Sequence, residues 1–240
     1  VGALFPLLCG VTLAAEEACS FEQMTFPLRG FSDHEVEFGG LKRRYVLYAP
    51  RNRGDPAVPR PLLILAPDDG LSPQEQVHMA GLVGEAEKGF FAFVALEGLH
   101  TEAMPGRREA GVVVDGAAYT QAVLSQVGRL LCLDAARVSC AGFGAGGRLC
   151  AAAASELRGL VAAIALVAGL DYPEPDHAGG PVSVLAFHGL KDPVHPFEGQ
   201  GDLQSIPDAA EAWAKFNSCT STEEEEGLQD GVTVVRHTGC

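Results

Sequence analysis

The segment Arg137–Cys150 reads RVSCAGFGAGGRLC and is the most informative stretch of the chain. Its first five residues, 137–141, predict a short buried strand. Glycines at 142, 144, 146 and 147 follow, and small residues continue to position 157 in a pattern that predicts a helix. Because glycine is required where a backbone passes close to itself, we expect a strand, a sharp turn and a helix in immediate succession.

On both sides of this segment, short apolar runs alternate with amphipathic ones. Continuous apolar runs are typical of strands buried in a parallel sheet, and helically spaced segments are typical of the helices that cover it. The fold class is therefore predicted as α/β, with an open, mostly parallel sheet and helices on both faces. The expected strands are 44–49, 62–66, 90–96, 137–141, 161–168, 182–187 and 232–236. The expected helices are 72–88, 115–131, 145–157 and one from 207 or 208 to 216.

The glycine-flanked turn has the layout of a nucleophile elbow, in which the central Ser of Gly-x-Ser-x-Gly points toward the substrate. Here Gly142 and Gly146 are the flanking residues, and Gly144 is the central one. The residue after the nucleophile donates its backbone N–H to the oxyanion, and Ala145 holds that position. Since Gly144 has no side chain, we expect the geometry of the elbow without its nucleophile.

Several motifs resemble those of the polyhydroxybutyrate depolymerase and feruloyl esterase-like family of α/β-hydrolases. They are the elbow VSCAGFGAGGRLC with its entry residues Leu133-Asp134 and Arg137-Val138, and the segments PVSVLAFHGLKDPVHPFEGQG (181–201), AWAKFNSC (212–219) and RRYVLYAP (43–50). The resemblance covers about residues 41–240. It implies an α/β-hydrolase fold and a carboxylic ester hydrolase of the polyester or feruloyl class that uses Ser, Asp and His in that chain order. It also implies a small-molecule or polymeric acyl ester as ligand, with no metal or organic cofactor.

The resemblance places the catalytic acid at Asp192, where the carboxylate would orient the catalytic histidine and stabilise its imidazolium form. Asp192 follows a predicted strand and is expected at the carboxyl edge of the sheet, where ligands bind in such folds. The residues alone leave a structural aspartate in the turn before Pro193 as an equal alternative.

Three departures from the family pattern predict that the chain does not hydrolyse esters. Gly144 replaces the nucleophile. The family's His-Gly oxyanion motif reads Pro67-Asp68 here, where proline has no N–H and Asp68 would repel a developing oxyanion. The family histidine follows a cysteine that matches Cys240, the last residue of the sequence. Because loss of a triad serine costs about a million-fold in kcat, we expect activity at background.

Other residues near these motifs are predicted to be structural. His188 is expected to pack under the loop of the acid, His195 to lie exposed on that loop, and His237 to lie on a strand surface. Ser139 and Cys140 belong to the strand beneath the elbow and are not expected to point into the cleft. We expect Cys140 to be buried or disulfide-bonded rather than reactive.

Composition restricts the class of partner. The 240 residues include 17 basic and 31 acidic side chains, for a net charge of −14. There is no basic stripe for nucleic acid or anionic lipid, and no Cys-x-x-Cys pair or histidine cluster that indicates zinc. The run of glutamates at 223–226 is expected to be a solvated loop.

The first fifteen residues, VGALFPLLCGVTLAA, resemble the apolar region and cleavage zone of a signal peptide and are too short to span a membrane. A buried N-terminal strand or helix is the alternative. Without Cys9 the chain has six cysteines, an even number suited to an oxidising compartment, with Cys219–Cys240 as the expected pair. We expect a secreted protein, with residues 1–18 as a signal-peptide remnant and residues 19–240 as a single domain truncated at its C-terminus.

Three functions fit these observations. The first is an ester hydrolase by descent, present here as an altered copy. The second is a binding module that recognises an acyl ester without cleaving it. The third is an extracellular structural or interaction role.

Overall fold

The structure is a computed structural model. It describes residues 19, 28–51, 58–98, 108–109, 112–113, 115–157, 159–173, 180–201, 204–226 and 231–240. The signal peptide predicted for residues 1–18 lies outside the described residues. No helix within the described part of the chain has the length and apolar character needed to cross a membrane.

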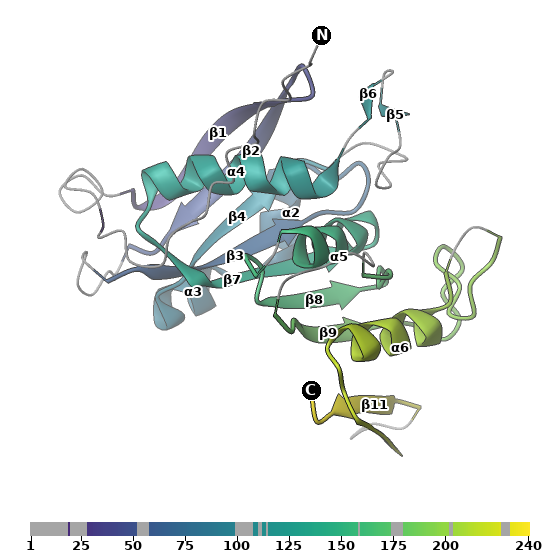
Figure 1. Cartoon of the computed structure of the whole chain (residues 1–240). Coiled ribbons are helices and arrows are strands. Elements are labelled where there is room, and N and C mark those ends of the chain that lie inside the picture. Colours follow the sequence, from purple (N-terminus) through teal and green to yellow (C-terminus); the bar gives the residue numbers. More distant parts are fainter. Residues whose placement is uncertain are drawn as a thin grey trace, which may run out of the picture.

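A seven-stranded sheet forms the centre of the molecule (Figure 1), and it is open and mostly parallel as predicted, although its edge strand β1 was not predicted. The two strand pairs β1–β2 and β2–β4 are antiparallel, and all pairs from β4 through β3, β7 and β8 to β9 are parallel. In spatial order the strands are β1 (Gly30–Phe38), β2 (Leu41–Ala49), β4 (Ala92–Leu96), β3 (Arg60–Ala66), β7 (Leu133–Phe143), β8 (Ala163–Val167) and β9 (Ser183–Phe187). The short strands β5 (Arg108–Glu109) and β6 (Val112–Val113) form a separate pair.

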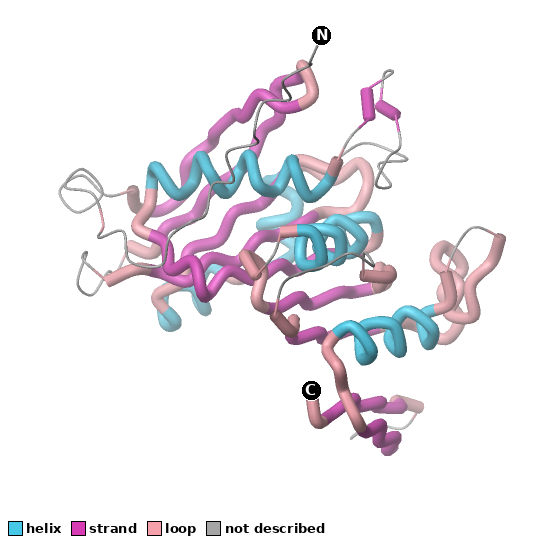
Figure 2. The backbone as a smooth tube through the Cα atoms, viewed as in Figure 1, coloured by secondary structure: helices cyan, strands magenta, loops and turns pink. Residues whose placement is uncertain are grey.

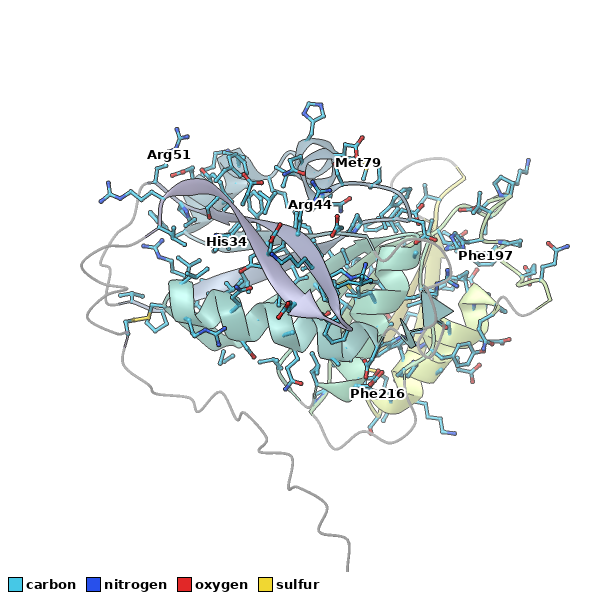
Figure 3. All side chains as sticks on the ribbon, turned by 90° about the horizontal axis from the view of Figure 1, so that it is seen from above. His34, Arg44, Arg51, Met79, Phe197 and Phe216 are labelled. Carbon is cyan, nitrogen blue, oxygen red and sulfur yellow. A yellow bond between two sulfur atoms is a disulfide. The ribbon has the colours of Figure 1, made fainter. Side chains whose placement is uncertain are left out.

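Helices cover both faces of this sheet, so the predicted α/β layering is confirmed (Figure 2). Figure 3 shows the two layers from above, with Met79 of α2 and Phe216 of α6 on opposite sides of the sheet. Each layer buries its own apolar cluster against the strands. One layer consists of α4 (Gly116–Leu130), α5 (Ala145–Glu156) and α6 (Ile206–Phe216), and the other of α2 (Pro73–Ala80) and α3 (Val83–Gly89).

The single helix predicted for residues 72–88 is wrong, because the chain forms two helices there. Ser72 begins α2 with a capping box to Glu75. Gly81 then adopts a left-handed conformation with φ of 61° and donates its N–H to the Val77 carbonyl, which ends α2. The chain starts again as α3 at Val83.

The C-terminal hairpin corrects two further predictions. The glutamates of 223–226 belong to β10 (Ser221–Glu226), a strand and not a loop. It pairs with β11 (Thr233–Thr238), so the strand expected near 232–236 exists but lies outside the main sheet (Figure 1). Glu225 forms an ion pair with Arg236, and the predicted Cys219–Cys240 disulfide closes the hairpin at its base.

The other two disulfides are at β7, one of them long-range in sequence and the other short-range. Cys19 pairs with Cys132, which precedes β7, across 113 residues of sequence. Cys140 of β7 pairs with Cys150 of α5, and both are completely buried. The three bridges use the six cysteines other than Cys9, and the expectation that Cys140 is buried or disulfide-bonded agrees with its place in the structure.

Candidate active site

The elbow lies where β7 ends and α5 begins. Gly144 is the residue before the helix and has φ of 53° and ψ of −120°, a combination that side-chain-bearing residues adopt at a cost of about 1–3 kcal/mol. Its N–H donates to the Val167 carbonyl at 2.9 Å, and its carbonyl accepts from the Gly147 N–H at 3.0 Å. The turn is therefore held on both sides by backbone hydrogen bonds and does not depend on a side chain at position 144.

Close backbone approach explains the flanking glycines. A Cβ atom at position 146 would lie 2.7 Å from the Pro67 carbonyl oxygen and closer still to that of Ala66. A Cβ atom at position 142 would lie 2.5 Å from the Gly147 nitrogen. The first turn of α5 thus packs directly against the end of β3, which brings the elbow next to the residues that follow β3.

Asp68 fills the space that a nucleophile would occupy. A Cβ atom at position 144 would lie 2.7 Å from Asp68 Oδ2 and closer still to Oδ1 and Cγ. The Ala145 N–H, the oxyanion donor of the elbow layout, donates to Asp68 Oδ1 at 2.8 Å. The carboxylate therefore fills the position where the Cβ atom of a nucleophile at 144 would be, and it also accepts the hydrogen bond of the neighbouring oxyanion donor.

This contact extends the prediction made for Pro67-Asp68. The sequence predicts that Asp68 repels an oxyanion, and the structure places its carboxylate directly against the oxyanion donor, the Ala145 N–H. Pro67 is buried and has no N–H. Glycine at 144 and aspartate at 68 are thus coupled, because a side chain at 144 and the carboxylate cannot share the same space. The sequence contains no local signal for this coupling, since 76 positions separate the two residues.

Asp192 lies on the loop after β9, at the carboxyl edge predicted for it. Its Oδ1 accepts the N–H groups of Val194 and His195 at 2.8 and 2.9 Å. Those two donors, that of His195 first, hold the pKa of Asp192 below its ordinary value, and His188 adds a smaller effect in the same direction. These bonds are those of a turn aspartate, and Oδ2 faces His188 Nε2 at 4.0 Å.

His188 lies beneath this loop, with a side chain that is only 4% exposed. Its Nε2–H donates to the His195 carbonyl at 2.7 Å, and its ring lies 6.1 Å from that of Phe197. Figure 3 shows Phe197 at the opposite end of the sheet from Arg51, which follows the antiparallel strand β2. The acid loop is therefore on the same edge as the carboxyl ends of the parallel strands.

The predicted site residues fall into two groups. Gly144, Ala145, Pro67 and Asp68 are in mutual proximity at the ends of β3 and β7. Asp192 lies at the same edge on the loop of β9, which is separated from β7 by β8. His237 lies on β11, where its Nδ1 is 3.0 Å from the Thr222 hydroxyl, in the separate hairpin.

The structure adds a feature that sequence analysis left open. The Cys140–Cys150 disulfide joins the strand and the helix on either side of the elbow. It fixes the two arms of the turn relative to each other. Among the described residues, no group of three or more His, Cys, Asp or Glu side chains is arranged as a metal site.

The sheet order, the strand-turn-helix elbow and the acid loop together define the α/β-hydrolase fold. A solved thermostable esterase superposes with a TM-score of 0.62 at 17% identity, over 78% of this chain and 52% of that one. An S-formylglutathione hydrolase from Agrobacterium tumefaciens superposes with a TM-score of 0.50 at 12% identity, over 59% of this chain and 58% of that one. At such identities the likeness establishes the fold alone.

Sequence relatives support an esterase-like α/β-hydrolase. NocK of Nocardia uniformis subsp. tsuyamanensis, which is named as an esterase, is 31% identical over 176 residues, or 69% of this chain and 49% of that protein. A protein of Aspergillus niger named as feruloyl esterase C is 28% identical over 125 residues, or 51% of this chain and 44% of that protein. The chain thus spans about half the length of the curated relatives it matches. No protein-family model matches the chain.

Proposed function

We propose that this chain is a secreted member of the carboxylic ester hydrolase lineage that does not carry out serine-dependent ester hydrolysis. One observation carries the proposal. The Asp68 carboxylate accepts the Ala145 N–H and fills the space where a nucleophilic side chain at position 144 would begin.

Acyl transfer at an elbow requires a nucleophile and an accessible oxyanion donor. Gly144 supplies no nucleophile, and the Ala145 N–H is already bonded to an anion. A substrate carbonyl oxygen would have to displace the carboxylate, and the negative charge of Asp68 would oppose the charge that develops on that oxygen. Loss of the nucleophile alone costs about a million-fold in kcat, so activity at background is expected.

Secretion is supported by two features. Residues 1–15 have the apolar composition of a signal sequence. Three disulfides join Cys19 to the residue before β7, β7 to the elbow helix, and the two ends of the C-terminal hairpin, and such bridges persist in oxidising compartments. The ligand proposed by family likeness is a small or polymeric acyl ester.

Steady-state hydrolysis of p-nitrophenyl butyrate and methyl ferulate tests the proposal. The unaltered chain and its Asp192→Asn variant should give the same rate, equal to that of buffer with heat-denatured protein. A saturable rate that Asp192→Asn lowers about 100-fold or more would contradict the proposal, because an orienting acid is worth that much or more in a working triad.

Binding without cleavage is the second candidate, and an apolar surface beside the elbow favours it. Phe143, Val167 and Phe187 are neighbours in register at the carboxyl ends of β7, β8 and β9. They are 36%, 44% and 58% exposed. An aromatic acyl group could pack on this surface. Calorimetric titration with methyl ferulate should show binding that Phe143→Ser weakens and that Phe31→Ser, a change of an exposed phenylalanine on β1, leaves unchanged.

A further inference from the structure

We infer that Asp68 is the reactive group of this elbow and that its carboxylate attacks a saturated carbon that bears a leaving group, rather than an acyl carbon. The inference rests on the proposed absence of serine chemistry. It concerns a residue that comes from the end of β3, outside the elbow, and that reaches the nucleophile position through space left by Gly144.

The geometry assigns separate roles to the two carboxylate oxygens. Oδ1 accepts the Ala145 N–H at 2.8 Å, which fixes the orientation of the group at the beginning of α5. Oδ2 lies 2.7 Å from the position of a Cβ atom at 144, within the volume where the side chain of an elbow nucleophile would be. The Asp68 side chain is only partly buried, so a ligand can approach it. Oδ2 is therefore the oxygen placed for attack.

Chemistry decides which electrophile this oxygen can use. Attack by a carboxylate on an ester carbonyl would form an anhydride. Because the anhydride is more reactive than the ester consumed, the equilibrium favours the starting ester. Attack on a saturated carbon forms an ordinary ester, which is stable. A carboxylate is an established covalent nucleophile in enzymes, and its product here would be an alkyl ester of Asp68.

The step balances without a further reactant. With a primary alkyl bromide, the Oδ2–carbon bond forms while the carbon–bromine bond breaks, and bromide leaves with the bonding electron pair. No proton is transferred. Oδ1 becomes the carbonyl oxygen of the new ester and can still accept the Ala145 N–H. The partly exposed ring of Phe143, adjacent to Gly144 in sequence, provides an apolar surface beside the elbow for an alkyl group.

Incubation with 2-bromoethanol followed by peptide mass mapping tests the inference. Asp68 should be alkylated at least about tenfold faster than Asp69, an exposed carboxylate next to it, because the Ala145 N–H holds the Asp68 carboxylate in position at the elbow. Treatment with hydroxylamine should remove the adduct, as expected for an ester, whereas adducts on thiol, imidazole or thioether groups would remain. Asp69→Asn should not change the rate at Asp68.

Two variants separate this reactivity from ordinary surface labelling. Asp68→Asn keeps an acceptor for the Ala145 N–H and should fold normally without any adduct at position 68. Gly144→Ala introduces a Cβ atom into the carboxylate's space and should lower labelling of Asp68 about tenfold or more. Equal labelling of Asp68 and Asp69 in the unaltered chain would overturn the inference. The ester-hydrolysis assay is independent of this readout, so failure of the inference and failure of the proposed function are distinguishable.

Discussion

At the scale of single residues, the geometry of the site depends on the pair Gly144 and Asp68. Gly144 and Asp68 look like independent departures from an esterase pattern when read along the sequence. In the structure they are coupled, because the carboxylate of Asp68 occupies the space that a side chain at position 144 would need. Aspartate at 68 requires glycine at 144, and glycine at 144 leaves space that Asp68 fills while it caps the Ala145 N–H.

The pair predicts non-additive stability. Gly144→Ala should lower the free energy of unfolding by about 2–4 kcal/mol, from backbone strain and from collision with the carboxylate. Asp68→Gly removes the collision, so the double variant should be more stable than the sum of the two single effects predicts, by about 1–2 kcal/mol. Urea unfolding of the four proteins measures this coupling energy. Strict additivity would mean that the two residues do not compete for space.

The environment of Asp192 predicts that its contribution to the stability of the folded state depends on pH. Its pKa is lowered chiefly by the His195 and Val194 N–H donors, so the ionised form stabilises the folded state. That contribution is complete above the unfolded pKa of about 3.9 and is lost as the pH falls through the lower folded value. Asp192→Asn should therefore lower the Tm at neutral pH, and the difference should vanish in acid. A difference that is the same at all pH values would contradict this assignment.

At the scale of elements, the strand and helix of the elbow were predictable, whereas their cross-link was not. Apolar runs and glycine spacing predicted β7 and α5 within a few residues. Six cysteines allow many pairings, and only three-dimensional proximity identifies Cys140 and Cys150 as partners. The bridge closes a loop that contains the whole turn.

Removal of this bridge should destabilise the elbow. In the chain-entropy account, a loop of this length contributes about 2.5–3 kcal/mol, and both sulfurs are buried. The double variant Cys140→Ala/Cys150→Ala should lower the free energy of unfolding by about 3 kcal/mol in guanidinium titration. The Cys219–Cys240 bridge closes an exposed hairpin away from the elbow. The matched control variant Cys219→Ala/Cys240→Ala, which removes it, should therefore leave the protection of the elbow amides from hydrogen exchange unchanged. If both double variants lost amide protection at the elbow to the same extent, the Cys140–Cys150 bridge would have no local role there.

The elements that sequence analysis missed share a physical cause. The glutamate-rich β10 has poor intrinsic strand propensity, and it is a strand because β11 pairs with it and a disulfide closes the hairpin. In β1, apolar residues are separated by charged ones, and the strand has a single partner at the sheet edge. Both depend on tertiary partners that local patterns do not encode. The break at Gly81 did have a local signal, a glycine at a helix end.

At the scale of the whole molecule, the fold does not depend on the site. The two apolar clusters lie between the sheet and its helices, with Trp213, Tyr45 and Phe93 among the largest buried side chains. The elbow is at the edge of this core. Glycine at position 144 therefore leaves burial of the core intact, which is why sequence patterns predicted the α/β-hydrolase architecture although that position has no side chain. The position of the Asp68 side chain could not be predicted from the sequence, because it depends on contact with an elbow 76 positions further along the chain.

The most direct test is hydrogen exchange of the Ala145 amide, followed by NMR in the unaltered chain and in the variants Asp68→Gly and Asp69→Gly. If the Asp68 carboxylate accepts this N–H, Asp68→Gly should accelerate exchange at Ala145 by about tenfold or more, since a net hydrogen bond to a charged group is worth about 1.5–3 kcal/mol. Asp69→Gly should leave it unchanged. If exchange at Ala145 is equally slow without Asp68, the carboxylate does not occupy the elbow, and the proposal that this chain does not hydrolyse esters loses the observation that carries it.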